Sequence, residues 1–327
     1  MKTIKAGIIG GAGFTGGELI RVLLNHPNVE LGFIHSRSHA GEPLHKAHAD
    51  LVGETAILFT DKIEHDVDVI FLCLGHGESK VFLDGQDFPS SVKIIDLSQD
   101  FRLRASAEKG GRSFVYGLPE LNKEEIKTAN NIANPGCFAT AIQLALMPLA
   151  DAKQLNSDIH ISAVTGSTGA GQSLTKTTGF TWRNNNISHY KAFKHQHLFE
   201  ISESLDKSQE GFEQSIHFIP YRGNFTRGIL ASVYLKTDLS EDELKSIFQE
   251  YYQDHVFTHV IDQPVDVKLV VNTNKCLIHV EKHGDMVLIT SAIDNLLKGA
   301  VGQATHNMNL LFGLEEKAGL NLKPSAF

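Results

Sequence analysis

The feature that most constrains the fold is a glycine cluster between an apolar run and an amphipathic run near the N-terminus. The run IKAGII is followed by GGAGFTG and then by GELIRVLLN, whose apolar residues have helical spacing. Gly11, Gly13 and Gly16 satisfy GxGxxG between the predicted strand and helix, and Gly10 with Gly13 fits the looser GxxGxxG. Glycine lets the backbone turn sharply and approach a pyrophosphate, whose charge the helix-start amides stabilise. The cluster predicts a dinucleotide site; the alternative is a tight turn without a ligand.

The residues after the second predicted strand, VELGFIH, favour one nicotinamide nucleotide over the other. NAD enzymes carry an Asp or Glu at this place, where it binds the ribose diol. This chain has Ser36, Arg37 and Ser38 there and no carboxylate. A guanidinium beside hydroxyls fits a 2′-phosphate, so the sequence favours NADP over NAD. The alternative interpretation of Arg37 is a solvated surface charge.

The order of the apolar runs predicts two domains of different architecture. Strand-like and helical runs alternate in the first part of the chain, which is typical of a parallel sheet between helices. After residue 134 a helix is followed by the strand-like runs IHISAVTG, SIHFIP, GILASVYL, VDVKLVV, KCLIHVE and MVLITSAI, which predict a mixed or antiparallel sheet. The expected class is α/β. A Rossmann-type NADP-binding domain spans residues 1–136 and is completed by a C-terminal helix, 303–327, and an α+β catalytic domain spans 137–302.

Charge and composition exclude several kinds of partner. The formal net charge is −8 and the basic residues are scattered, so we expect no binding of nucleic acid. No run approaches the roughly 18 apolar residues of a membrane helix, and the N-terminus has no signal-peptide pattern, which predicts a cytoplasmic protein without a membrane partner. The three cysteines lack the spacing of a zinc site, so we expect neither a disulfide framework nor a metal.

Cys137 is the cysteine with a chemical context. Pro135 and Gly136 predict a turn, and FATAIQLALM after the cysteine predicts an apolar helix. A thiol at a helix start is favoured as the reactive thiolate. Cys73 and Cys276 lie in apolar strands and are interpreted as small core residues. Beside a dinucleotide site, a thiolate allows hydride exchange with a covalently held acyl group, as a thioester or a thiohemiacetal.

The segment IANPGCFATAIQLALMP resembles the active-site segment of the N-acetyl-gamma-glutamyl-phosphate reductase family. GGAGFTGGEL, SRSHAG, IIDLSQDFRL, YGLPEL, TGSTGAG, HQHLFEI and DNLLKGAVGQA follow the family's order over nearly the whole chain. The resemblance implies NADPH reduction of the acyl phosphate N-acetyl-glutamyl 5-phosphate to the semialdehyde, with release of phosphate, through a Cys137 thioester in arginine biosynthesis. It also implies a catalytic domain like that of aspartate-semialdehyde dehydrogenase, and a homodimer or homotetramer.

The resemblance also assigns roles to individual residues. HQHLFEI supplies His195, His197 and Glu200 beside the nucleophile Cys137, and which histidine is the acid–base group stays open. Predicted substrate-binding residues are Asn134 and Arg102 of DFRLR, whereas Arg104 has a surface position as its alternative. The predicted cofactor-binding residues are Gly10, Gly11, Gly13, Phe14, Thr15, Gly16, Ser36, Arg37, Ser38, Ser167, Gly169 and Asn295.

Some positions depart from the family pattern. Gly75, Ala139 and Phe199 stand where proline is common, and Gln196 lies between the histidines. No reacting group is lost, but a related reductase acting on aminoadipyl or aspartyl phosphate stays an alternative. An alternative from another class is a non-catalytic NADP-binding redox sensor with Cys137 as its switch, in which DFRLR and HQHLFE would have no purpose.

Overall fold

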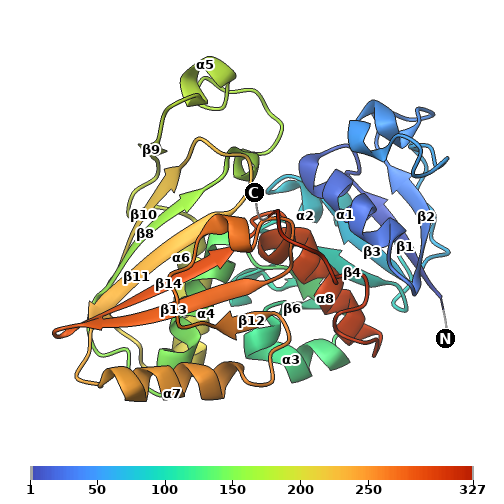
Figure 1. Ribbon diagram of the computed structural model, residues 1–327. Helices are drawn as coiled ribbons and strands as arrows, with labels where there is room; N and C mark the ends of the chain where they lie inside the picture. The colour runs from blue at the N-terminus through green and yellow to red at the C-terminus, as the bar shows by residue number, and fades with distance from the viewer. Residues whose placement is uncertain (1–2, 326–327) are drawn as a thin grey trace. The chain divides into compact units, whose positions relative to one another are not determined.

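The computed structural model describes residues 3–325 and divides them into two compact units. Unit 1 consists of residues 3–135 and Ala300–Asn321, and unit 2 consists of Gly136–Gly299 with residues 322–325. Each unit has one seven-stranded sheet (Figure 1).

The sheet of unit 1 has the strand order β2-β1-β3-β4-β7-β6-β5. All neighbours are parallel except β5 and β6, as a doubly wound fold requires. The central strands are buried almost throughout, so their apolar runs do not alternate with polar residues. The elements of unit 1 are β1 (Ile4–Ile9), α1 (Phe14–Leu24), β2 (Val29–His35), β3 (Val69–Leu72), α2 (Glu78–Asp84), β4 (Lys93–Asp96), β5 (Glu108–Lys109), β6 (Arg112–Tyr116), α3 (Pro119–Thr128), β7 (Asn131–Ala133) and α8 (Gly302–Leu311), with short 3₁₀ turns at Leu44–Lys46, Ala49–Leu51 and Arg104–Ser106.

The sheet of unit 2 has the strand order β12-β13-β14-β11-β8-β10-β9 and is mixed. The pairs β8/β10 and β12/β13 are parallel and the others are antiparallel, which confirms the predicted mixed sheet. Burial alternates along β8 and β11, and α4 packs on β11 and β14. The elements of unit 2 are α4 (Cys137–Asp151), β8 (Ile159–Thr165), α5 (Phe180–Arg183), β9 (Ser188–His189), α6 (His197–Ser208), β10 (Ile216–Arg222), β11 (Ile229–Lys236), α7 (Glu241–Tyr252), β12 (Thr258–Val260), β13 (Cys276–His283) and β14 (Met286–Ile293), with 3₁₀ turns at Ser167–Ala170 and Val267–Leu269 and a π-helical turn at Leu297–Val301 that continues into α8.

Helix α4 is apolar on every side and forms part of the core of unit 2. All of its residues from Phe138 to Ala150 are buried. The buried amide of Gln143 donates to the backbone oxygen of Glu200 on α6 at 3.2 Å, so its polarity is satisfied. Cys137, the predicted nucleophile, is the first residue of this buried helix. Its backbone position is therefore held by the core of unit 2.

Two predictions about elements are wrong. The run VDVKLVV forms a 3₁₀ turn rather than a strand, because Asp266 accepts from the Lys268 amide at 2.7 Å and so turns the backbone. The predicted C-terminal helix 303–327 ends at Leu311, and Gly313 takes a left-handed φ of 64° after it.

The end of the chain also departs from the predicted domain boundary. Residues 322–325 group with unit 2, since the Ser325 amide donates to Val271 O at 3.4 Å and its hydroxyl accepts from the Asn272 amide at 2.8 Å. The last two residues of the predicted helix lie outside the described residues.

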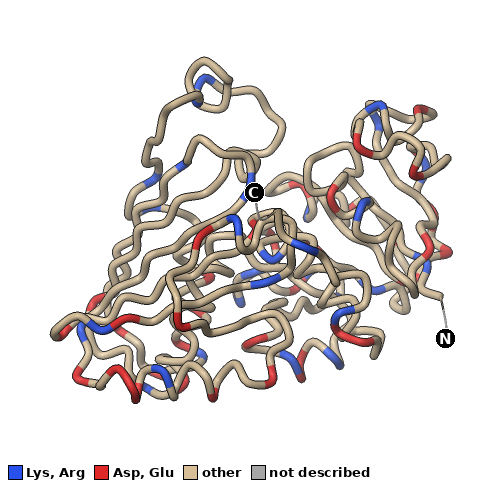
Figure 2. Tube along the Cα trace, viewed as in Figure 1, with Lys and Arg blue, Asp and Glu red and all other residues tan. Residues whose placement is uncertain are grey.

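Charged residues of both signs are mixed along the chain. Figure 2 shows acidic and basic residues interspersed along the traces of both units. Within residues 3–325, no helix has both the length and the apolar character needed to cross a membrane.

Candidate active site

The predicted glycine turn joins β1 to α1 in unit 1. Gly10 has a φ of +82°, and a Cβ there would lie 2.5 Å from Cys73 O. A Cβ at Gly16 would lie 2.6 Å from Gly10 O, so neither position can carry a side chain. Gly13 is the N-cap of α1, and no side chain caps the helix. Backbone amides therefore face outward at this helix start, as the binding of a pyrophosphate requires.

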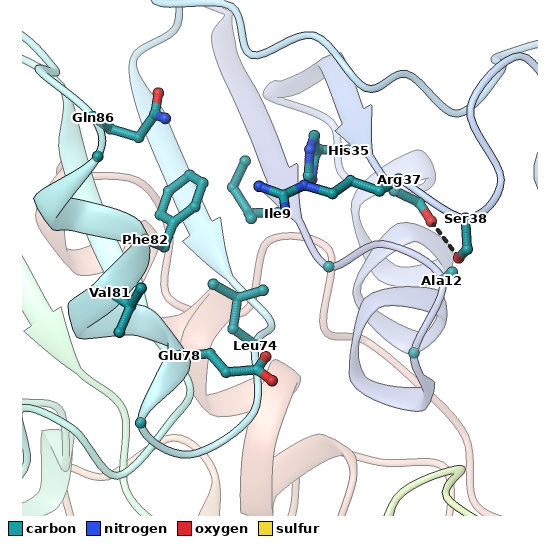
Figure 3. Close-up of a pocket in the computed structure, with 15 residues that line it drawn as sticks. Ile9, Ala12, His35, Arg37, Ser38, Leu74, Glu78, Val81, Phe82 and Gln86 are labelled. Atoms are coloured by element: carbon teal, nitrogen blue, oxygen red, sulfur yellow. Dashed lines mark hydrogen bonds between the residues drawn. The ribbon is translucent and has the colours of Figure 1, made fainter.

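A pocket of about 680 Å³ opens beside this turn, within unit 1. Gly10 and Gly13 line it together with Ser36, Arg37 and Ser38 at the end of β2. Figure 3 shows the Arg37 side chain reaching across the pocket toward the side that carries Phe82 of α2. The hydroxyls of Ser36 and Ser38 lie 3.4 Å apart. The structure thus brings together the glycines and the Ser-Arg-Ser segment that were predicted to bind the cofactor.

The other predicted residues of the glycine turn do not line the pocket. Gly11, Phe14, Thr15 and Gly16 shape the turn and the start of α1, and Phe14 is exposed. Sequence reasoning also passed over His48, which is buried and has its Nε2 atom 2.7 Å from Gly11 O. This histidine holds the backbone of the glycine turn in place through its contact with Gly11.

Several residues that line the pocket were missed. Phe82 and Gln86 come from the α2 region at a spacing of four residues, and Val81 beside them is strongly exposed for an apolar residue. This exposure is visible only in the structure, so no signal in the sequence marks these residues. His35 also lines the pocket, and burial, with the Arg37 charge as a second cause, lowers its pKa.

The two predicted substrate-binding residues lie in unit 1 and are buried. Arg102 donates from Nε to Asn134 O at 2.8 Å and from Nη2 to Leu97 O at 3.0 Å. The Asn134 amide donates to Ala300 O at 3.0 Å and accepts from Asn307 at 3.1 Å. Arg102 is therefore no surface charge, whereas Arg104 is exposed. The chain reaches Cys137 three residues after Asn134.

Cys137 begins α4, as predicted, and its helix start is tied to α6. The amide of the N-cap Gly136 donates to Glu200 Oε2 at 3.1 Å. Glu200 is 4% exposed, so this carboxylate is held inside unit 2 by the backbone that precedes the nucleophile.

His195 and His197 are brought together at the start of α6, with ring centroids 4.6 Å apart. The His197 amide donates to His195 Nδ1 at 3.3 Å, which leaves the proton of a neutral His195 ring on Nε2. Burial, with the Lys191 charge as a second cause, lowers the pKa of His195 to about 4, so this ring is neutral at pH 7. His197 Nε2 lies 3.9 Å from Glu200 Oε1.

The remaining predicted residues, Ser167, Gly169 and Asn295, also come together in unit 2. Asn295 is buried; its amide donates to the Thr168 hydroxyl at 3.0 Å, and its Oδ1 accepts from Gly228 at 2.8 Å. The Ser167–Ala170 turn is thereby fixed to the segment that precedes the π-helical turn.

Sequence reasoning missed Tyr190 and Arg222 in unit 2. Burial raises the pKa of Tyr190 to about 12, and the charge of a Cys137 thiolate contributes in the same direction. The Tyr190 ring lies 5.7 Å from the His195 ring, measured between centroids. The Arg222 guanidinium carbon lies 4.7 Å from the Tyr190 ring centroid. Neither residue belongs to a recognisable motif. The two are brought together only by the pairing of β9 with β10.

The other cysteines are structural, as predicted. All three cysteines are free, so the chain has no internal disulfide. Burial and the nearby Asp96 raise the pKa of Cys73, which disfavours its thiolate. Cys276 is buried with Sγ 3.4 Å from the Ser291 hydroxyl. Cys137 is therefore the cysteine placed for chemistry.

Comparison with known proteins defines the class. Residues 5–129 match the semialdehyde dehydrogenase NAD binding domain, and residues 137–295 match the semialdehyde dehydrogenase dimerisation domain. Aspartate semialdehyde dehydrogenase II of Vibrio cholerae, complexed with ASA, has a TM-score of 0.73 at 16% identity over 96% of this chain and 99% of its own. The Candida albicans aspartate semialdehyde dehydrogenase with NADP has a TM-score of 0.66 at 16% identity over 97% and 99%. The predicted α/β fold is confirmed: the chain is a semialdehyde dehydrogenase that takes a nicotinamide cofactor.

Relatives at higher identity narrow the assignment. N-acetyl-gamma-glutamyl-phosphate reductases of Christiangramia forsetii and Flavobacterium johnsoniae are each 57% identical over 99% of this chain, and that of Bacteroides thetaiotaomicron is 55% identical over 99%; all three are covered over their full length. The chain belongs to the N-acetyl-gamma-glutamyl-phosphate reductase family. It is an acyl-phosphate reductase of the phosphorylating semialdehyde dehydrogenase type, so the redox-sensor alternative is wrong.

Proposed function

We propose that the chain reduces N-acetyl-L-glutamyl 5-phosphate with NADPH to N-acetyl-L-glutamate 5-semialdehyde and phosphate, in arginine biosynthesis. The observation that carries the proposal is Cys137 at the start of α4, between Gly136, whose amide donates to Glu200, and Phe138, whose ring packs against both histidines. The names of relatives at 55–57% identity supply the substrate.

The chemistry begins at Cys137. Its thiolate attacks the acyl carbonyl carbon, the C–O bond to phosphate breaks, and the phosphate leaves to give a thioester. The nicotinamide, when bound, supplies the hydride that reduces the acyl group. The Cys137 amide at the helix start is proposed to stabilise the oxyanion, and breakage of the C–S bond releases the semialdehyde and the thiolate.

We assign the acid–base role to His197. His195 is neutral at pH 7 because its pKa lies near 4, so it serves as a hydrogen-bond donor through Nε2. His197 faces the Glu200 carboxylate at 3.9 Å, which orients the ring and stabilises its protonated form. The proton at the oxygen of the reacting carbon would then be held by His197.

NADP rather than NAD is the proposed cofactor. Ser36, Arg37 and Ser38 line the pocket beside the glycine turn, and within residues 3–325 Arg37 forms no ion pair. A 2′-phosphate would supply the missing anion through a charged hydrogen bond. Ser167, Gly169 and Asn295 of unit 2 are proposed to contact the nicotinamide end.

The remaining assignments follow the same reaction. Arg102 and Asn134 are the proposed receptors of the acyl phosphate, because a guanidinium fork matches a phosphate oxygen pair. Unit 2 matches a dimerisation domain, which supports a homodimer or homotetramer. The proposed compartment is the cytoplasm, where a catalytic thiol stays reduced.

The test is the dependence on phosphate in the reverse direction. Oxidation of N-acetylglutamate semialdehyde by NADP⁺ needs an oxyanion to attack the Cys137 thioester, so phosphate or arsenate should stimulate it strongly. Initial rates of NADPH formation with and without phosphate measure this, with aspartate and aminoadipate semialdehydes as competing substrates. Full oxidation without phosphate, or a preference for another semialdehyde, would refute the proposal.

A further inference from the structure

Helix α2 forms one wall of the cofactor pocket, and its first residue provides no cap for the helix. Val81 and Phe82 of α2 and Gln86 just after it line the pocket on the side that Arg37 reaches toward (Figure 3). The N-cap residue is Gly77, which has a left-handed φ of 87° and no side chain with which to cap the helix. The free amides of the first turn therefore need acceptors from elsewhere in the fold.

Asp100 supplies these acceptors from the loop that follows β4. Its Oδ1 atom accepts from the Gly77 amide at 2.6 Å, and its Oδ2 atom accepts from the Lys80 amide at 3.1 Å. The Gln99 amide adds a bond in the other direction, to His76 Nδ1 at 3.2 Å. A carboxylate at a helix start is also stabilised by the helix dipole. The N-terminal cap of α2 is thus contributed by a residue 23 positions along the chain from Gly77.

Asp96, the last residue of β4, holds the same turn through a serine. The Ser79 hydroxyl on α2 donates to Asp96 Oδ1 at 2.6 Å, and the Ser98 hydroxyl donates to Oδ2 at 2.7 Å. Ser98 Oγ accepts in turn from the Asp100 amide at 3.0 Å, which joins the two carboxylates in one network. Asp96 is fully buried, and burial raises its pKa to about 6, whereas the serines and the Arg102 charge act in the opposite direction. A buried carboxylate is costly unless it is hydrogen-bonded, so Asp96 depends on these serines.

Arg102 ends the same loop but is fixed by other bonds. Its guanidinium donates to the backbone oxygens of Asn134 and Leu97, neither of which belongs to α2. The loop thus makes two separate sets of contacts, one to the first turn of α2 and one to the backbone around Arg102. The reaction described above uses the second set and assigns no role to Asp96 or Asp100.

We infer that Asp96 and Asp100 are positioning residues for the cofactor, because they hold the first turn of α2 against the end of β4 and so fix the pocket wall that carries Val81 and Phe82. Apolar side chains cannot offset the desolvation of a phosphate, so this wall packs on the rings and riboses that NADPH and NADH share. Arg37, by contrast, is assigned to the 2′-phosphate alone. The inference rests on the proposed function through the cofactor that it places in this pocket.

Asp100→Asn tests the inference, because the amide keeps the size of the side chain but can accept from one of the two helix amides only through its single oxygen. Titration of nicotinamide fluorescence without substrate measures Kd for NADPH and for NADH. Both values should rise by about tenfold. In the reverse reaction, kcat at saturating NADP⁺ and KM for phosphate should change by less than about threefold, because Arg102 keeps its own bonds. Ser79→Ala should weaken both nucleotides in the same way but less.

Asp68→Asn is the matched control. Asp68 Oδ2 also accepts a backbone amide in unit 1, from Lys5 at 2.9 Å, but it lies at the starts of β1 and β3, at the opposite ends of these parallel strands from the pocket. This variant should bind both nucleotides like the wild type, and thermal melting compares its folding with that of Asp100→Asn. If Asp100→Asn does not fold, Ser79→Ala carries the same test.

Four results would overturn the inference. These are an unchanged Kd in both α2 variants, a loss for NADPH without a loss for NADH, a fall in kcat as large as the rise in Kd, and an equal loss of binding in Asp68→Asn. Failure of the wild-type protein to bind either nucleotide would instead refute the proposed cofactor itself, and the inference with it, before any variant is measured.

Discussion

The cofactor pocket of unit 1 and the group of residues around Cys137 in unit 2 are built in opposite ways. The pocket takes its predicted contacts from two short segments, the glycine turn with Gly10 and Gly13 and the residues Ser36–Ser38, which follow adjacent parallel strands. The residues around Cys137 come from elements far apart in the sequence: Cys137 starts α4, Tyr190 follows β9 and Arg222 ends β10. Backbone geometry makes the first site, whereas contacts of buried side chains with one another and with the backbone of distant elements make the second. Nucleotide binding should therefore be separable from chemistry by single substitutions.

The largest separation is expected at the nucleophile. Cys137→Ser should reduce turnover by several orders of magnitude, because a serine hydroxyl is rarely ionised at neutral pH, whereas NADPH binding to unit 1 should be kept. Steady-state rates and NADPH titration by fluorescence measure the two effects. Cys276→Ser is the matched control, since its hydroxyl can face Ser291. Substantial residual turnover in the Cys137 variant would remove the covalent mechanism.

Two glycine substitutions, one in the cofactor turn and one beside Cys137, test whether the two sites can be disrupted separately. A Cβ at Gly16 would lie 2.6 Å from Gly10 O, so Gly16→Ala should weaken NADPH binding by roughly 10- to 100-fold through displacement of the turn. A Cβ at Gly299 would lie 2.8 Å from Cys137 Cβ, so Gly299→Ala should lower kcat by about tenfold or more and leave NADPH affinity unchanged. Gly179→Ala, where a Cβ meets nothing closer than 3.8 Å, is the control. Loss of both properties in both variants would show that the two sites are not separable.

The smallest expected effect concerns the choice of nucleotide. Arg37→Ala should raise KM for NADPH by about tenfold and leave KM for NADH almost unchanged, because one charged hydrogen bond to the 2′-phosphate is lost. Kinetics with both nucleotides, at constant ionic strength, measure the difference. An equal change for NADPH and NADH would assign Arg37 to the surface and leave the nucleotide preference to other residues.

The pocket could be predicted from the sequence because its determinants are local. Gly10 and Gly16 are needed for one turn, and Arg37 stands directly after a strand, so spacing alone places them together. Cys137 was predictable for the same reason, since the Pro-Gly turn and the apolar helix adjoin it. In each case a short stretch of sequence contains the physical cause.

The rest could not be predicted because its causes are non-local. Tyr190 meets Arg222 only through the pairing of β9 with β10, which no periodicity in either segment indicates. The Glu200 contact with the Gly136 amide depends on how α6 packs on α4. The run VDVKLVV looked like a strand because hydrophobic spacing does not report that Asp266 bonds to its own backbone.

The packing of α8 on unit 1 has a consequence for folding during synthesis. This helix is wholly buried, and Asn307 on it donates to Gly117 O at 2.9 Å and to Asn134 Oδ1 at 3.1 Å. On the ribosome, α1 and α3 therefore emerge without the helix that packs on them, and α8 follows only after residues 136–299 of unit 2 are synthesised. A nascent chain that stalls before residue 300 lacks a finished nucleotide-binding unit. Such a product exposes the surface of α3 that α8 would cover, and chaperones and proteases recognise surfaces of this kind.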